Sequence, residues 1–238
     1  MSEQTTMDAR ERIVRAATEL LAHGGREAVS TRAVSAAAGV QAPTIYRQFG
    51  DMRGLMDAVA REALEAYVRQ KTLHEPSDDP VEDLRRGWDL HVAFGLGNPA
   101  VYTLIYGDPT ALADTPAARQ GAAILQGRVE RVARAGWLRV SVVQAVWMIS
   151  SAARGVTLSL IALPPEARDP RLAESMRDAV FAAILAPADA APDGSPGADV
   201  ATRAVALRAV LGEAPAVLSP AEQHLLGEWL DRLASAAG

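Results

Sequence analysis

The sequence contains no cysteine among its 238 residues. Without thiols the chain can form no disulfide framework and no thiolate zinc site, and it has no cysteine nucleophile. Aromatic residues make up only 5% of the chain, so the core must consist mainly of alanine, leucine and valine. The N-terminus shows no charged segment followed by an apolar one, so no signal peptide is visible. We therefore expect a protein of the reducing cytoplasm.

Lysine is almost absent, because Lys71 is the only lysine among 24 basic residues. Together with the abundant alanine, this arginine bias indicates a GC-rich bacterial genome. The net charge of −5 is unevenly distributed. Residues 1–75 carry 10 basic and 10 acidic side chains, which leaves 14 basic and 19 acidic side chains for the remainder.

No acidic residue lies between Glu27 and Asp51, whereas Arg32 and Arg47 lie inside that interval. Salt screens charges over about 8–10 Å, so this local balance matters more to a nearby phosphate than the distant acidic residues do. The interval is therefore compatible with nucleic acid, despite the acidic whole.

The same interval has the pattern of two helices joined by a tight turn. Ser30 can cap the first helix, and Gly39 can end it in a left-handed conformation. Pro43 suits the first turn of a second helix, in which Ile45 and Phe49 form the buried side. This arrangement predicts a helix-turn-helix unit whose second helix enters the DNA major groove.

The sequence resembles the TetR-type family of transcriptional regulators from about Asp8 to Tyr67. The resemblance rests on several motifs in the family's order and spacing: His23-Gly24-Gly25, Ser30-Thr31-Arg32-Ala33-Val34, Ala37-Ala38-Gly39-Val40, Pro43-Thr44-Ile45-Tyr46-Arg47-Gln48-Phe49, Gly50-Asp51 and Leu55. The resemblance implies that the protein binds double-stranded operator DNA, responds to a small-molecule effector and forms a homodimer.

The resemblance also assigns residues to the DNA contact. The positions that resemble phosphate contacts are Thr31, Arg32, Thr44 and Tyr46, and those that resemble base-reading positions are Gln41, Ala42, Pro43 and Arg47. The chain departs from the family at the start of the fourth helix, where Met52 stands in place of the usual lysine. We expect that phosphate contact to pass to the next residue, Arg53.

The predicted fold is all-α and has two domains. A helix over about Asp8–His23, the helix-turn-helix and a fourth helix over about Asp51–Lys71 make an N-terminal helix-turn-helix DNA-binding domain of three or four helices, residues 8–73. The polar, proline-containing segment His74–Pro80 is predicted to be a linker. Residues 81–238 then form a larger helical ligand-binding and dimerisation domain, with predicted helices over about 81–96, 99–106, 116–135, 141–163 and 169–185.

The nearly apolar segment Ser141–Leu163 could be interpreted as a membrane span. However, Gln144 and Arg154 lie within it, and an arginine at the centre of a span costs about 2.5–3.5 kcal/mol on insertion scales. We therefore predict no membrane association. A helix buried against its own core and a partner subunit fits better, so the dimer is expected to form through 141–163 and 169–185.

Two further helices, within about residues 199–236, form a C-terminal two-helix extension that the family resemblance does not require. The second of them has an apolar stripe that includes Leu225, Trp229 and Leu233. The pair could serve as a protein-interaction module in addition to any regulatory role.

Patterns that indicate other chemistry are weak. Gly95-Leu96-Gly97-Asn98-Pro99-Ala100 fits a dinucleotide-binding pattern, but it follows a predicted helix instead of a strand, and Pro99 interrupts it. The four histidines are scattered, and no serine lies in a nucleophile elbow. We predict no catalytic residues, no metal site and no cofactor.

Candidate effector contacts are polar, aromatic or methionine side chains on otherwise apolar helices: Trp88, His91, Tyr102, Tyr106, Trp147, Met148 and Arg154. Such residues at helical spacing more often belong to the core, and a single histidine often completes a local hydrogen bond. The prediction is a ligand-responsive transcriptional regulator, a repressor released from a palindromic operator. The alternative is an all-helical enzyme or ligand carrier with a degenerate N-terminus that only resembles a helix-turn-helix.

Overall fold

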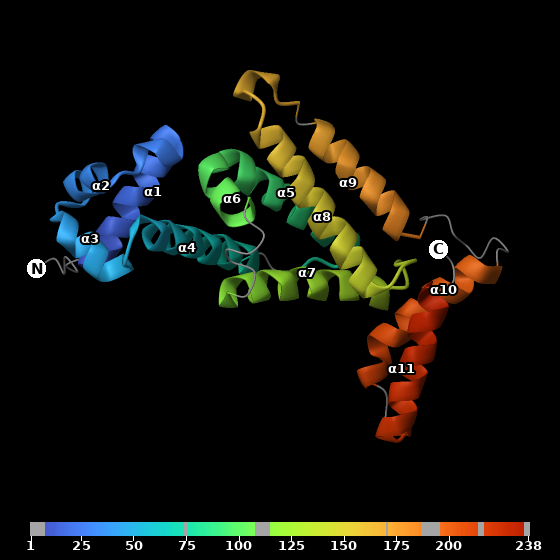
Figure 1. The fold of residues 1–238 in the computed structure, drawn as a ribbon. Helices are drawn as coiled ribbons and strands as arrows, with labels where there is room; N and C mark the ends of the chain where they lie inside the picture. The colour runs from blue at the N-terminus through green and yellow to red at the C-terminus, as the bar shows by residue number, and fades with distance from the viewer. Residues whose placement is uncertain are drawn as a thin grey trace, which may run out of the picture. The chain divides into compact units, whose positions relative to one another are not determined.

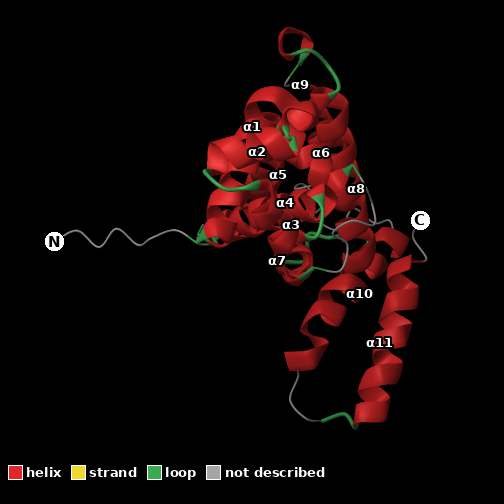
Figure 2. Cartoon of the chain, turned by 60° about the vertical axis from the view of Figure 1, so that its left-hand side comes forward, coloured by secondary structure: helices red, strands yellow, loops and turns green. Residues whose placement is uncertain are grey.

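A computed structural model describes residues 8–73, 76–107, 115–169, 171–186, 196–213 and 217–235. Within these ranges the regular structure is helical, as Figure 2 shows, apart from one isolated β-bridge between Leu138 and Leu185. The predicted all-α fold is therefore confirmed. Residues 74 and 75 of the predicted linker lie outside the described ranges, as does residue 236 of the predicted extension.

The chain divides into two compact units. The first consists of Met1–Leu73 and Ala93–Gly121, and the second of His74–Val92 and Ala122–Gly238. One edge of this division coincides with the predicted boundary after residue 73. Ala93–Gly121, however, groups with the N-terminal helices, although the sequence places it in the C-terminal domain. The two-domain boundary stays a prediction.

The first unit is built around α1 (Ala9–Ala28), α2 (Thr31–Ala38), α3 (Ala42–Phe49) and α4 (Met52–Thr72), followed later in the chain by α6 (Pro99–Tyr106) (Figure 1). α1 packs against α2, α4 and α6, and α4 also packs against α3 and α6. The core consists of buried apolar side chains from α1 to α4: Ile13, Val14, Ala17, Leu21, Val34, Ala38, Ile45, Leu55, Val59 and Leu64.

α1 extends further than the sequence predicts. The expected end was His23, but helical structure continues to Ala28 across a kink at Gly25. Gly25 has a φ of 65° and a ψ of −168°, which only glycine adopts readily. The glycine pair therefore bends the chain before α2 without ending the helical segment.

The second unit contains most of α5 (Pro80–Gly97) and α7 (Pro116–Arg134), together with α8 (Val142–Ile161), the 3-10 turn η1 (Pro165–Ala167) and α9 (Arg171–Ile184). α8 and α9 pack against each other. The backbone of Arg139 donates to Ile184 and that of Ala186 donates to Trp137, which ties the end of α9 to the α7–α8 connection. Among the described residues, no helix is long and apolar enough to cross a bilayer.

The last helices, α10 (Pro196–Val210) and α11 (Pro220–Ser235), form an antiparallel hairpin whose connection includes the 3-10 turn η2 (Leu211–Glu213). The predicted pair of C-terminal helices is therefore present. A small cluster of Ala204, Leu211 and Leu230, with Leu226 packed against it, holds the hairpin together.

Candidate nucleic-acid interface

The α2–turn–α3 segment has the geometry that the sequence predicts. The Ser30 hydroxyl accepts a hydrogen bond from the Ala33 backbone N–H at 3.2 Å and so caps α2. Gly39 ends α2 with a φ of 63° and a ψ of 41°. α3 begins directly after Gln41 with Pro43 in its first turn. Local sequence rules therefore fix both the length of the turn and the start of the second helix.

The predicted DNA contacts of this segment are all exposed or partly exposed. Arg32, Gln41, Pro43, Tyr46 and Arg47 are exposed, while Thr31, Ala42 and Thr44 are partly exposed. Ile45, on the opposite side of α3, is completely buried. α3 therefore buries one side in the core and presents its polar side outward.

A side-chain hydrogen bond links the two helices at this surface. The hydroxyls of Thr31 and Tyr46 lie 3.1 Å apart, although the residues are separated by fifteen positions. Both were predicted as phosphate contacts, and the bond brings them together at the N-terminus of α2. The positive end of a helix dipole favours an anion there.

Two side chains of α1 contact the ends of α2 and α3. The Arg10 guanidinium lies 5.1 Å from the centre of the Phe49 ring, at the end of α3. The Arg12 side chain donates to the carbonyl of Ala38 at 3.3 Å, which satisfies an acceptor at the end of α2. Neither contact was predicted, since each depends on the packing of α1.

At the start of α4, the Asp51 carboxylate accepts from the Gly54 backbone N–H at 2.7 Å and caps the helix. Met52 is partly buried, whereas Arg53 is exposed beside the cap. This placement leaves Arg53 accessible for the contact expected from the missing lysine. Its role as a DNA contact stays a prediction.

The predicted effector contacts separate between the two units. In the first unit, Tyr102 is completely buried, and its ring centre lies 4.5 Å from that of Tyr106. Phe94 lies 6.2 Å from Tyr102 and stacks on Tyr67 at 4.2 Å. The prediction missed Tyr67 and Phe94. Phe94 lies one helical turn after His91, a spacing that could have indicated it.

In the second unit, Trp88 on α5 is 2% exposed and meets Phe181 of α9 edge-to-face, with ring centres 6.5 Å apart. The indole Nε1 of Trp88 has no hydrogen-bond acceptor among the described residues. His91, one turn further along α5, is partly buried. A buried donor without a partner is costly in a folded protein and invites an explanation.

The remaining candidates lie on α8, where Met148 is partly buried and Arg154 is exposed. Trp147 is 67% exposed. The exposure of Trp147 and Arg154 within one chain suits a surface contact better than an enclosed pocket. Their role as effector contacts stays a prediction.

A buried carboxylate that the sequence did not single out lies at the beginning of α5. Asp83 is 6% exposed. It accepts hydrogen bonds from the backbone and hydroxyl of Ser77 at 3.0–3.1 Å, from Arg86 at 2.5 Å and from Arg131 of α7. Arg131 also donates to the Ser77 carbonyl. We call this group of four residues the Asp83 clamp.

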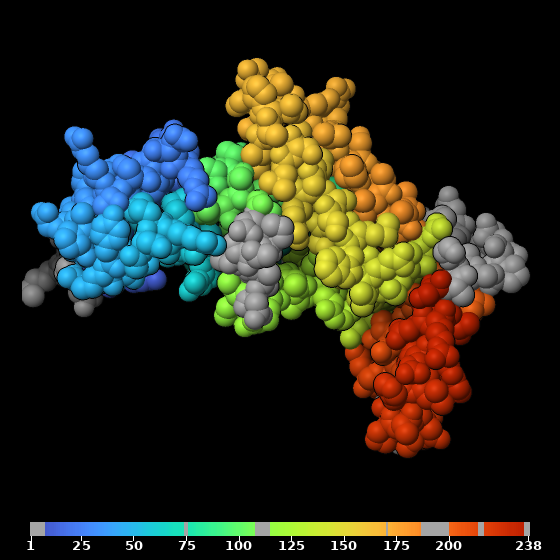
Figure 3. Space-filling view, in the orientation of Figure 1, coloured from blue at the N-terminus to red at the C-terminus, as the bar shows by residue number. Residues whose placement is uncertain are grey.

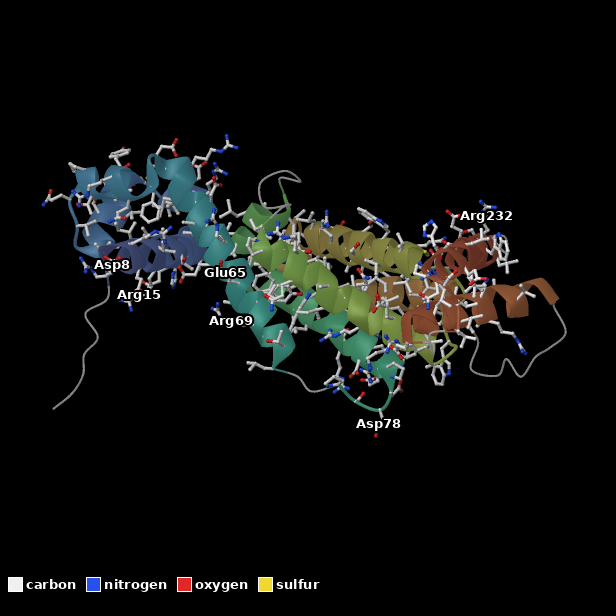
Figure 4. The ribbon with its side chains drawn as sticks, turned by 90° about the horizontal axis from the view of Figure 1, so that it is seen from below. Asp8, Arg15, Glu65, Arg69, Asp78 and Arg232 are labelled. Atoms are coloured by element: carbon white, nitrogen blue, oxygen red, sulfur yellow. The ribbon has the colours of Figure 1, made fainter. Side chains whose placement is uncertain are left out.

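Burial alone would raise the pKa of Asp83, but hydrogen bonds from the Ser77 backbone and from Arg131 outweigh it and hold the pKa below its ordinary value. The neighbouring Asp78 is exposed and points away from the ribbon (Figure 4). The clamp therefore fixes the second half of the predicted linker to α5 and α7.

Within the described part of the chain, no group of three or more histidine and carboxylate side chains could hold a metal ion.

Comparisons with known proteins point to one family. A family model for bacterial regulatory proteins of the TetR family matches residues 13–59, from α1 to the middle of α4. The class C tetracycline repressor protein of Escherichia coli is 39% identical over 70 residues, which cover 29% of this chain. The alignment spans only 31% of that repressor's length.

Solved structures resemble the fold over a longer stretch. A transcriptional regulator from Saccharomonospora viridis in complex with choline matches with a TM-score of 0.61 at 16% identity, covering 75% of this chain and 98% of that one. A TetR variant from Acinetobacter baumannii in complex with minocycline matches with a TM-score of 0.55 at 23% identity, covering 72% of this chain and 93% of that one.

These two structural matches show the fold, while the family model and the repressor alignment match in sequence as well. The helix-turn-helix surface lies inside the residues that the family model matches. Over residues 13–59 the chain is therefore similar to bacterial regulatory proteins of the TetR family, and its fold resembles that of solved TetR-family structures.

Proposed function

We propose that this protein is a transcriptional repressor that a small organic effector releases from a palindromic operator. The observation that carries the proposal is the outward surface of α2 and α3. There the linked Thr31 and Tyr46 hydroxyls and the exposed Arg32 and Arg47 lie over a buried apolar side. Hydroxyls and arginines bind DNA phosphates and so position the protein on the duplex. An arginine on the second helix can read a guanine edge.

Two observations support an effector. Tyr67, Phe94, Tyr102 and Tyr106 make an aromatic cluster in the first unit, and Trp88 in the second unit keeps a buried N–H without an acceptor. Effector sites are mostly apolar with a few placed polar groups. An effector with a hydrogen-bond acceptor would satisfy Trp88. The choline and minocycline bound by two structural relatives are small organic ligands of the kind expected.

Exposed apolar side chains at the start of α8 and at the start of α9, which we together call the α8–α9 face, support a homodimer. Val143 and Trp147 of α8 are each 67% exposed, and Leu172 and Met176 of α9 are also exposed. Each pair is four residues apart and so lies on one side of its helix. An apolar surface of this kind marks an interface, and a symmetric dimer is the commonest arrangement. Two reading helices in successive major grooves need half-sites about 34–36 Å apart, which implies a palindrome.

In this proposed function the protein catalyses no reaction. It acts in the cytoplasm, where bacterial DNA is accessible. Because effector and DNA bind to different residues, the effector must favour one arrangement of the two reading helices. An effector with equal affinity for both arrangements would change nothing.

The test uses the full chain and fluorescently labelled DNA from upstream of its own gene, with scrambled DNA of equal length as the control. We expect specific binding that weakens with salt. A compound that raises the melting temperature, with choline and minocycline tested first, should then weaken operator binding by about 5–150-fold. Operator DNA should weaken binding of that compound by the same factor.

Equal affinity for upstream and scrambled DNA would contradict operator binding and favour the ligand-carrier alternative. Equal compound affinity with and without operator would leave a DNA-binding protein but remove the switch.

A further inference from the structure

The α10–α11 hairpin leaves one side uncovered. Its helices pack on each other through small and apolar side chains. Outside this contact, five large apolar side chains in the described part of the hairpin remain between 43% and 51% exposed: Val200 of α10, and a group of four, Leu207, Leu225, Trp229 and Leu233. We call these four residues the hairpin stripe. They belong to the orange and red part of the chain in Figure 3. So much exposed apolar surface on two helices indicates an interface.

The hairpin stripe lies on one side of the hairpin. Leu225, Trp229 and Leu233 are spaced by four residues, so they follow one line along α11. The Arg208 guanidinium of α10 lies against Gly227 and 3.3 Å from Asp231, which places Arg208 level with Trp229. Leu207 precedes Arg208 and is rotated by about 100° around α10. This rotation turns Leu207 toward the side of Trp229, opposite Asp231.

The α11 part of the stripe is symmetric about Trp229, because a leucine lies four residues before it and another four residues after it. A two-fold axis through Trp229 therefore sets Leu225 of one copy opposite Leu233 of the other. It also sets the two Trp229 rings together and brings each Leu207 near the axis. A surface that complements itself under a two-fold rotation is what a symmetric interface between identical chains requires.

The charges beside the stripe agree with antiparallel pairing. Glu228 and Arg232 lie on the outer edge of α11 and pair with each other at 3.8 Å. The Arg232 side chain is 76% exposed and projects from the ribbon in Figure 4. With antiparallel helices, Arg232 of one copy comes within about 3 Å along the axis of the level of the other copy's Glu228, at 1.5 Å per residue. Parallel pairing would instead place like charges opposite each other.

We infer that the hairpin is a self-association surface, at which α11 of one chain packs antiparallel on α11 of a second copy about Trp229. This interface is additional to the α8–α9 face and requires neither DNA nor effector. Its success or failure is therefore separate from that of the proposed repressor function.

Disulfide trapping tests the pairing, because the chain has no cysteine of its own. Full-length Leu225→Cys and Leu233→Cys variants carry different tags, keep Trp229, and are mixed and mildly oxidised. The inference expects a disulfide between the two tagged chains as the main product. The control replaces Leu225→Cys by His224→Cys, on the polar side of α11 with 80% side-chain exposure. Mixed disulfides no more abundant than in the control would overturn the inference.

A second measurement uses sedimentation of the full chain over a range of concentrations. In a Trp147→Glu background, which removes association through the α8–α9 face, Trp229→Glu should weaken self-association at least about tenfold, since it places charges at the two-fold axis, where unpaired buried charge is costly. Helical content by circular dichroism confirms that the variant is folded, which is expected because Trp229 is half exposed. An unchanged association constant would overturn the inference, leaving the stripe to a different protein.

Discussion

The predicted DNA contacts and the predicted effector contacts differ in how the fold arranges them. The DNA contacts come from a short stretch, Thr31 to Arg53, and lie at exposed or partly exposed positions. The effector contacts come from three helices. They range from the fully buried Tyr102 to Trp147, which is 67% exposed. A surface built within one local motif follows from sequence, whereas a site assembled from distant helices depends on their packing.

Substitutions outside the predicted DNA contacts test this comparison, when their effects on DNA binding and on stability are both measured. If the regions communicate only through the dimer, a change in the α8–α9 face should abolish tight DNA binding without altering α3. A substitution in a buried contact should lower the free energy of unfolding and leave the preference for operator DNA unchanged.

The largest effect is expected for Trp147→Glu, which places a charge on the apolar α8–α9 face. The variant should become monomeric at that face and lose about 10²–10⁴-fold in operator affinity, because the second half-site then no longer binds intramolecularly. Light scattering and gel shift measure the two consequences. Trp137→Glu, at a tryptophan that is 48% exposed in the α7–α8 connection, is the matched control. Because α11 can associate independently, light scattering is done in a Trp229→Glu background, where a variant that is still dimeric would move the interface away from α8 and α9.

An intermediate effect is expected for Asp83→Asn in the Asp83 clamp. Losing hydrogen bonds to a buried carboxylate should lower the free energy of unfolding by about 2–3 kcal/mol near pH 7. Urea unfolding measures this. Asp78→Asn, at an exposed neighbour, should leave the free energy of unfolding unchanged and serves as the control.

The pH dependence of the clamp has a definite sign. Because the folded-state pKa of Asp83 is lowered, its contribution to stability is complete above the unfolded pKa of about 4 and is lost as the pH falls through the lower folded pKa. The difference between wild type and Asp83→Asn should therefore narrow only below about pH 4. A difference that narrows near neutral pH would contradict this account of the clamp.

The N-terminal helices show what local sequence can predict. Ser30, Gly39 and Pro43 mark helix ends through backbone chemistry that needs no tertiary information, and the structure has all three as expected. Gly25 shows a limit of such rules, because its left-handed conformation bends α1 without ending it.

Contacts between residues far apart in the sequence show what local sequence patterns do not predict. Asp83 was not singled out, because Arg131 lies forty-eight positions away and no local pattern marks their contact. In the first unit, Phe94 and Tyr67 were not predicted for the same reason, because the two stacked rings come from different helices. Helical periodicity gives the side of a helix that is buried, but not the residue that it meets.

The most direct test of the central claim compares Arg47→Ala with Tyr46→Phe on operator and on random DNA. If Arg47 reads a guanine edge, Arg47→Ala should cost about 1–3 kcal/mol on the operator and much less on random DNA. Tyr46→Phe should weaken both by a similar factor, because a phosphate contact carries no sequence information. Arg171→Ala, at a surface arginine of α9, controls for the loss of one positive charge. Equal losses on operator and random DNA for Arg47→Ala would contradict the account.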